Sequence, residues 1–186
     1  WFCGLDGVID LPRVLRTARA MADFDVLCLQ EVAINYPRLQ GDASADQPAL
    51  LRQLLPDFEV CFGAAVDELA ADGRSRQRFG NLIASRLPVA HVQHHSLPYP
   101  AHAGMRSMPR MATCATLHAP WGPLRVMTTH LEYYSPHMRM AQTQELLRLH
   151  AQASAQALQP PLPDDSGGPF QAKPHAVDCL VTADFN

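Results

Sequence analysis

Four side chains that could take part in acid–base or metal chemistry stand at the ends of apolar runs in this 186-residue sequence. Glu31 follows DVLCLQ, His130 follows PLRVMTT, and Asp184 and Asn186 close VDCLVTADFN. A short apolar run that ends in polar residues is typical of a strand buried on both faces of a sheet. We therefore expect three buried strands whose exits bring these side chains together if the strands are neighbours.

The spacing of Asp184 and Asn186 favours a shared site. Residues i and i+2 of an extended segment face the same side, so both side chains are expected to point into one crevice with Glu31 and His130. Structural interpretations also exist: Glu31 could cap a neighbouring loop, His130 could be a satisfied structural histidine, and the last pair could form a closed Asx turn. Their occurrence together at three similar strand ends favours a functional site.

The side-chain types indicate a hard cation. Carboxylate and amide oxygens suit Mg²⁺ or Mn²⁺. Tetrahedral zinc would need cysteines or several histidines at short spacing, and the sequence has neither an H-E-x-x-H motif nor a C-x-x-C pair. A divalent ion that is held by few carboxylates and keeps several waters is common at sites that act on phosphate esters.

The pattern around these residues predicts helices and strands in mixed order, which indicates a layered α/β or α+β architecture. Asp10 and Ser135 are good N-caps, each closely followed by proline. The expected helices are 11–22, 48–58 and 135–155, and the expected strands are 25–32, 58–65, 81–86, 89–97, 111–119, 123–130 and 177–186. Loops are expected at 67–80, 97–110 and 159–176, the last of them mobile.

The composition indicates one globular domain. Apolar residues make up 47% and charged residues 18%, which excludes a disordered or coiled-coil chain. The net charge of -3 excludes a strongly basic nucleic-acid-binding protein, although a nuclease with a local cationic groove stays compatible. No apolar run approaches the roughly 18 residues of a membrane span. The five widely spaced cysteines are expected to be free thiols in a reducing, cytoplasmic compartment.

Five motifs, in order along the chain, resemble the endonuclease/exonuclease/phosphatase superfamily, which has the deoxyribonuclease-I-like fold. They are DVLCLQEV, FGNLIASRLPV, RVMTTHLE, the R-x-x-Q of Arg139 and Gln142, and TADFN. The resemblance implies a four-layer α/β/β/α sandwich of two mixed sheets, incomplete at the C-terminus. It also implies hydrolysis of a phosphate ester by in-line attack of water, with Mg²⁺ (or Mn²⁺) as cofactor.

The resemblance implies roles for individual residues. Glu31 would bind the metal ion, Asp184 would orient or deprotonate the attacking water, and Asn186 would hold a phosphoryl oxygen. His130 would stabilise developing charge or lie beside the leaving group. Arg110 matches an arginine that binds substrate or supports the site. Such roles suit a phosphoryl transition state, which needs positioning and charge neutralisation more than covalent help.

The family also has an asparagine on its first strand and a late Asp-His pair, and neither has a match within residues 1–186. We therefore expect residues 1–186 to form a single domain of this superfamily that is truncated at both ends.

Core residues shared by the superfamily do not separate its nucleases from its phosphatases, because loops decide the substrate. We expect a phosphodiesterase or nuclease-like hydrolase. The alternatives are a phosphomonoesterase acting on a small or lipid-derived phosphate, and a catalytically inactive binding module of the same fold.

Two arginine-bearing loops, one with Arg74, Arg76 and Arg78 and one with Arg106 and Arg110, could contact phosphates or simply face solvent. Nucleic-acid binding is expected to be weak, because the arginines are spread along the chain and duplex affinity needs many cationic contacts.

Two further pairs of side chains have open assignments. Tyr133 and Tyr134 could border the pocket. The pair His94 and His95 could form a second metal site, but a surface strand end is favoured.

Overall fold

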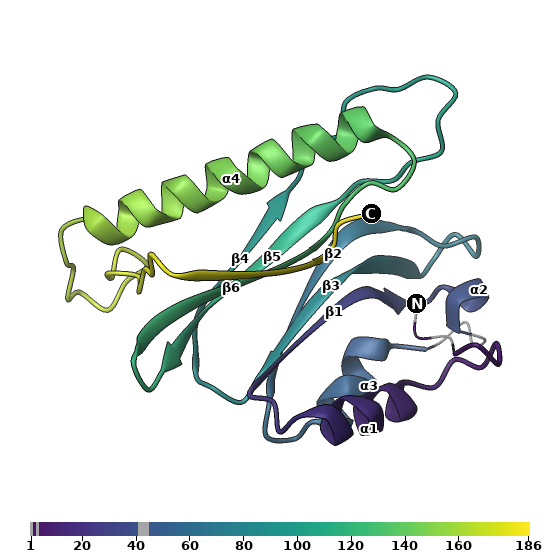
Figure 1. The fold of residues 1–186 in the computed structure, drawn as a ribbon, viewed down its shortest axis with the longest axis horizontal. Helices are drawn as coiled ribbons and strands as arrows, with labels where there is room; N and C mark the ends of the chain where they lie inside the picture. Colours follow the sequence, from purple (N-terminus) through teal and green to yellow (C-terminus); the bar gives the residue numbers. More distant parts are fainter. Residues whose placement is uncertain (1, 3, 41–44) are drawn as a thin grey trace.

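The computed structural model of this chain describes residues 2, 4–40 and 45–186. Four layers follow one another in Figure 1: α1 and α3, a first β-sheet, a second β-sheet, and the long helix α4. The helices are α1 (Leu11–Met21), α2 (Pro37–Gln40), α3 (Gln47–Leu54) and α4 (Pro136–Leu158). The strands are β1 (Val26–Ile34), β2 (Glu59–Leu69), β3 (Arg76–Ser85), β4 (Val89–Ser96), β5 (Met111–Ala119), β6 (Gly122–His130) and β7 (Cys179–Asp184). The expected four-layer sandwich is thus confirmed.

The strand order places the ends of β6 and β7 beside each other. The first sheet has the order β1-β3-β2 and the second the order β4-β5-β6-β7. The described pairs of the first sheet are antiparallel, whereas the second sheet is mixed because β6 and β7 run parallel. In that parallel register His130 lies opposite Asp184. Two of the expected site residues therefore leave the same sheet edge side by side.

Helix starts follow the expected capping chemistry. The Asp10 carboxylate accepts a hydrogen bond from the backbone N–H of Arg13 at 2.9 Å, and the Ser135 hydroxyl accepts one from Met138 at 3.3 Å. Each side chain satisfies a backbone donor that has no partner inside its helix. Proline stands in the first turn of both helices, where its missing N–H costs nothing.

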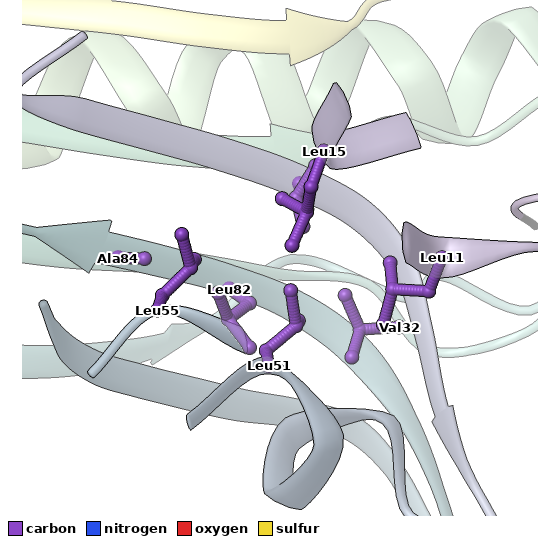
Figure 2. Packing of buried hydrophobic residues seen from close by; sticks show 8 residues of the cluster. Leu11, Leu15, Val32, Leu51, Leu55, Leu82 and Ala84 are labelled. Atoms are coloured by element: carbon purple, nitrogen blue, oxygen red, sulfur yellow. The ribbon is translucent and has the colours of Figure 1, made fainter. Parts of the chain in front are cut away.

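The core under the first sheet consists of aliphatic side chains from α1, from the α3 region and from strands β1 and β3. Figure 2 shows leucines of α1 and of the α3 region packed against the strands. Burial of such a side chain stabilises the fold by about 1.5–3 kcal/mol relative to exposure. The labelled members are Leu11, Leu15, Val32, Leu51, Leu55, Leu82 and Ala84.

The sheets are also joined by polar contacts. The Gln30 amide of β1 donates to the Thr128 hydroxyl of β6 at 2.8 Å. The Asn81 amide of β3 donates to the backbone carbonyl of Met111 on β5 at 3.0 Å. These bonds satisfy polar groups between the sheets and hold the strands that carry the site in register.

The expectation that VDCLVTAD forms a buried strand is wrong. Leu180 and Val181 of β7 are 57% and 44% exposed. The reason is that β7 is the edge strand of the second sheet and pairs only with β6 among the described strands. Apolar sequence alone does not distinguish a central strand from an edge strand.

The expected loop at 67–80 is wrong as well, because most of it belongs to a β-hairpin. Strands β2 and β3 remain paired as far as Leu69 and Arg76, so the connection is short. Asp67 binds the guanidinium groups of Arg76 and Arg78 at 2.8 and 3.1 Å. Two of the three arginines that could have contacted phosphates are therefore paired with a carboxylate.

Residues 159–178 contain no helix or strand, as expected for a loop, and their mobility stays a prediction. Of the five cysteines, Cys3 lies outside the described residues, and the other four are free thiols. No helix in the described ranges is both long and apolar enough to cross a membrane.

Candidate active site

One pocket of about 360 Å³ gathers all five residues that the sequence assigned to a site. It lies where β1, β6 and β7 approach one another. Tyr133 and Tyr134 border it, as considered from the sequence. Its lining residues are Glu31, Met108, Arg110, His130, Tyr133, Tyr134, Asp184 and Asn186.

Glu31 reaches the pocket because β1 is irregular at this point. The pairing of β1 with β3 shifts register between Leu29 and Val32, and Glu31 has a φ of 59°. A non-glycine residue in this left-handed conformation is uncommon, and β-bulges beside active sites re-aim a side chain. The expectation that Glu31 ends its strand is wrong, since β1 continues to Ile34. A bulge, and not a strand exit, turns the carboxylate toward the second sheet.

His130 lies between two carboxylates. Its Nδ1 is 3.7 Å from Glu31 Oε1, and its Nε2 is 3.7 Å from Asp184 Oδ2. Both distances are longer than a hydrogen bond. Burial, followed by the neighbouring Arg110 guanidinium, lowers the pKa of His130 to about 4. The imidazole is therefore uncharged at neutral pH and can donate through only one of its nitrogens.

Asp184 and Asn186 make a local contact and still face the shared pocket. The backbone N–H of Asn186 donates to Asp184 Oδ1 at 3.1 Å, as in an Asx turn. The Asn186 amide donates to the backbone carbonyl of Leu131 at 2.9 Å, which ties the end of the described chain to the segment after β6. The expectation that the pair forms no local turn is therefore wrong, but the turn leaves both side chains in the pocket lining.

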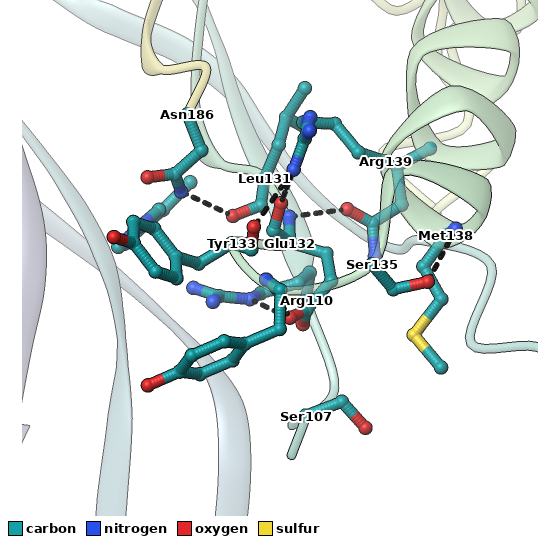
Figure 3. A network of polar contacts seen from close by, with 12 residues as sticks. Ser107, Arg110, Leu131, Glu132, Tyr133, Ser135, Met138, Arg139 and Asn186 are labelled. Carbon is teal, nitrogen blue, oxygen red and sulfur yellow. Dashed lines mark hydrogen bonds and ion pairs between the residues drawn. The ribbon is translucent and has the colours of Figure 1, made fainter. Parts of the chain in front are cut away.

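Arg110 is a buried cation beside the pocket, and its partner was not identified from sequence. Its Nε lies 3.6 Å from Glu132 Oε2, and both side chains are almost completely buried. Within the described part of the chain, Nε and Nη1 of Arg110 have no hydrogen-bond partner. A buried guanidinium with spare donors at a pocket wall suits a phosphate oxygen. Figure 3 shows Arg110 and Glu132 beneath Tyr133 and Asn186.

The R-x-x-Q motif holds the segment that carries Glu132. The Arg139 guanidinium donates to the backbone carbonyls of Glu132 and Tyr133 at 2.7 and 3.0 Å (Figure 3). The Gln142 side chain accepts from the Glu132 N–H at 2.9 Å and donates to the Pro98 carbonyl at 3.2 Å. Both motif residues therefore act on the scaffold and not on the pocket.

An ion held by few protein ligands fits these residues better than a caged metal. Glu31 and Asp184 present carboxylates that are 34% and 54% exposed on either side of His130. Among residues 2, 4–40 and 45–186, no group of three or more His, Cys, Asp or Glu side chains could hold a metal ion. Mg²⁺ keeps several waters and binds through one or two carboxylates, so Glu31 is a suitable ligand. His94 and His95 lie near the end of β4, with His94 exposed and His95 partly buried, which agrees with the favoured surface strand end.

Met108, Tyr36 and Phe79 lie close to Glu31 and were missed by sequence reasoning. They come from an irregular loop, from the residue before α2 and from β3, and no spacing in the sequence connects them. Only tertiary structure brings them to the site.

One family model matches most of this chain. The model of the Endonuclease/Exonuclease/phosphatase family matches residues 5–162. A comparison of the sequence with curated proteins found no match.

Solved structures with the same fold share little sequence with this chain. ANGEL2, described as a 2′,3′-cyclic phosphatase in complex with adenosine-2′,3′-vanadate, is 20% identical with a TM-score of 0.57 over 100% of this chain and 47% of its own. The human Nocturnin catalytic domain with bound sulfate is 18% identical with a TM-score of 0.56 over 93% of this chain and 55% of its own. A Bacteroides thetaiotaomicron mannosyl-6-phosphatase is 13% identical with a TM-score of 0.55 over 94% and 55%. The chain thus spans about half the length of these structures.

Proposed function

Because this chain belongs to the Endonuclease/Exonuclease/phosphatase family, we propose that it carries most of the active site of a Mg²⁺-dependent phosphodiesterase. The observation behind the proposal is the single pocket lined by Glu31, His130, Asp184, Asn186 and Arg110. It combines exposed carboxylates with a buried guanidinium. Both suit phosphate-ester hydrolysis, because carboxylates can place a metal ion and water while a guanidinium can neutralise negative oxygens.

In the proposed mechanism, each side chain of the pocket has one role toward the water or the phosphate ester. Asp184 accepts a proton from the attacking water as the water oxygen forms a bond to phosphorus and the bond from phosphorus to the leaving oxygen breaks. His130 donates a hydrogen bond to the phosphoryl group or leaving oxygen. The buried Arg110 guanidinium stabilises the equatorial oxygens electrostatically. Asn186 has a second amide hydrogen beyond the one directed to Leu131, and this hydrogen can bind a phosphoryl oxygen.

Glu31 would hold the Mg²⁺ (or Mn²⁺) ion. When bound, this ion would neutralise negative charge on the phosphoryl group. The left-handed backbone of Glu31 supports this assignment, since strain at a bulge beside a pocket favours a functional role over a stabilising one.

The assay for this proposal is hydrolysis of bis-p-nitrophenyl phosphate by the full-length protein with Mg²⁺, with and without EDTA. We expect Glu31→Gln to lower kcat/KM by at least about 10²-fold, in line with loss of a charged group at a catalytic metal. Glu59→Gln, which changes an exposed carboxylate on β2, is the matched control and should retain activity. Turnover that survives EDTA, or an active Glu31→Gln variant, would contradict the metal assignment.

The monoesterase alternative is separated in the same assay by p-nitrophenyl phosphate. Relatives of this fold include a cyclic phosphatase and a mannosyl-6-phosphatase, so the fold is compatible with diesters and monoesters. A higher kcat/KM for the monoester would favour a phosphomonoesterase. Absence of turnover with both substrates would favour the inactive binding module.

Duplex nucleic acid is not the proposed substrate. The formal charge is -3, and two arginines of the β2–β3 hairpin are paired with Asp67. A salt titration of duplex binding in Ca²⁺ tests this expectation. Submicromolar affinity of the full-length protein at about 0.15 M salt would show that the charge argument fails and would favour a dedicated nuclease.

A further inference from the structure

A second cavity adjoins the active-site pocket and shares Glu31 and Met108 with it. It has a volume of about 280 Å³ and lies between β1, the short helix α2 and the β2–β3 hairpin. Its lining residues are Glu31, Tyr36, Leu39, Val66, Phe79 and Met108. A molecule whose phosphorus occupies the active-site pocket could therefore extend directly into this cavity.

The lining excludes a second charged or sugar-like group. Among the residues that the structure describes, those that line this cavity include no Arg, Lys or His, and Glu31 at the shared border is their only charged member. No cationic side chain among these described residues could pair with a second phosphate. The Tyr36 hydroxyl is committed to Glu68 at 2.8 Å, so the wall also lacks the convergent donors and acceptors that a sugar requires. The lining therefore suits an uncharged group that needs few polar contacts.

The chemistry of the wall favours a flat ring. The rings of Tyr36 and Phe79 pack edge to face, with centroids 6.2 Å apart and an interplanar angle of 82°. One wall of the cavity therefore consists mainly of aromatic carbon. Met108 adds a polarizable thioether, which makes favourable contacts with ring edges. The volume of about 280 Å³ corresponds to roughly nine water molecules. That is the size of one ring system and too small for a long acyl chain.

We infer that this cavity binds an aromatic ring on one ester group of the substrate, so that the preferred substrate is a small phosphodiester bearing a nucleobase or an aryl ring. The inference rests on the proposed phosphodiesterase function and adds the substrate class. Phosphorus would lie beside Arg110 and His130, while the ring would lie against Tyr36 and Phe79.

The experiment compares four p-nitrophenyl diesters that share one leaving group, with thymidine 5′-, phenyl, hexyl and methyl as the second ester group. The full-length protein is assayed as wild type and as Val66→Phe, which places a ring in the cavity opposite Phe79 in the strand register. Leu69→Phe is the matched control, because Leu69 lies on the same strand, is 55% exposed and lines neither cavity.

We expect wild-type kcat/KM for at least one of the two diesters with a ring in the second ester group, the one that stays on phosphorus, to exceed that of the methyl diester by about tenfold or more, as one buried aromatic contact would contribute. Val66→Phe should remove this preference, whereas Leu69→Phe should retain it. A preference for thymidine alone identifies a nucleobase, and a preference for phenyl alone identifies a simple aryl group. A preference for hexyl, no ring preference, or an equal loss on all four diesters would overturn the inference.

Binding measurements separate this inference from the proposed function. Calorimetry with thymidine 5′-monophosphate and methyl phosphate does not require turnover. Tighter binding of the thymidine ligand that Val66→Phe abolishes supports the cavity even if no diester is hydrolysed. Equal affinity of the two ligands, in an enzyme that hydrolyses diesters, overturns the cavity and leaves the proposed function standing.

Discussion

Strands β6 and β7 run parallel and end side by side at the candidate active-site pocket, yet their environments differ sharply. Met127 of β6 is 2% exposed, while its register partner Val181 on β7 is 44% exposed. The segment after β6 is held by Arg139 and Gln142, whereas Asp184 at the end of β7 is 54% exposed. The site therefore combines a rigid buried wall with an exposed wall, and polar groups on the two walls should have different energetic roles.

The largest effect is expected for Asp184→Asn on the exposed wall. If Asp184 accepts the proton of the attacking water, kcat should fall by about 10²–10⁴-fold. The unfolding free energy should change by less than about 0.5 kcal/mol, because the residue is exposed and asparagine can still accept the Asn186 N–H. Parallel kinetics and urea denaturation of the full-length protein test both expectations. A large loss of stability would contradict the description of β7 as an exposed wall.

Arg110→Ala on the buried wall is expected to behave differently, by lowering stability as well as activity. Removal of one partner of a buried ion pair leaves Glu132 uncompensated and costs about 3–5 kcal/mol. Urea denaturation provides the measurement. The double variant Arg110→Ala/Glu132→Gln should recover part of this loss, because it removes the unpaired charge. If Arg110→Ala unfolds at the same urea concentration as the wild type, the Arg110–Glu132 ion pair at 3.6 Å does not contribute to stability.

Matched truncations compare the two strands directly. Met127→Ala should lower the unfolding free energy by about 2–5 kcal/mol, because it leaves a cavity between the sheet and α4. Val181→Ala, at the paired position on β7, should change it by no more than about 0.5–1 kcal/mol. Equal losses of unfolding free energy in the two variants would mean that other residues cover β7 in the full-length protein.

A smaller effect than those of Arg110→Ala and Met127→Ala is expected at the support of the buried wall. Gln142→Ala leaves the Glu132 N–H and the Pro98 carbonyl without their side-chain partner, which should cost about 1–3 kcal/mol. Gln144→Ala, on the exposed side of the same helix, is the control and should change stability by less than about 0.5 kcal/mol. Thermal unfolding of both variants gives the comparison, and equal melting temperatures would contradict the role assigned to the R-x-x-Q motif.

Local sequence patterns were sufficient for much of the fold. N-cap residues followed by proline located the starts of α1 and α4, since capping depends only on neighbouring backbone groups. Apolar runs located most strands, because a buried strand needs apolar side chains at neighbouring positions along the sequence. The exposure of β7 and the hairpin at 67–80 were not predictable in this way, because they depend on which strands lie alongside.

For the site, the sequence by itself determined the chemical types and their association with strands: Glu31, His130, Asp184 and Asn186 were identified from apolar runs and a family resemblance. Tertiary structure decided how they meet. The bulge at Glu31, the parallel register of His130 with Asp184, and the burial of Arg110 against Glu132 all depend on contacts between segments far apart in sequence. The aromatic cavity beside Glu31 has the same origin: Tyr36, Phe79 and Met108 become neighbours only when the hairpin, the loop and the helix pack together.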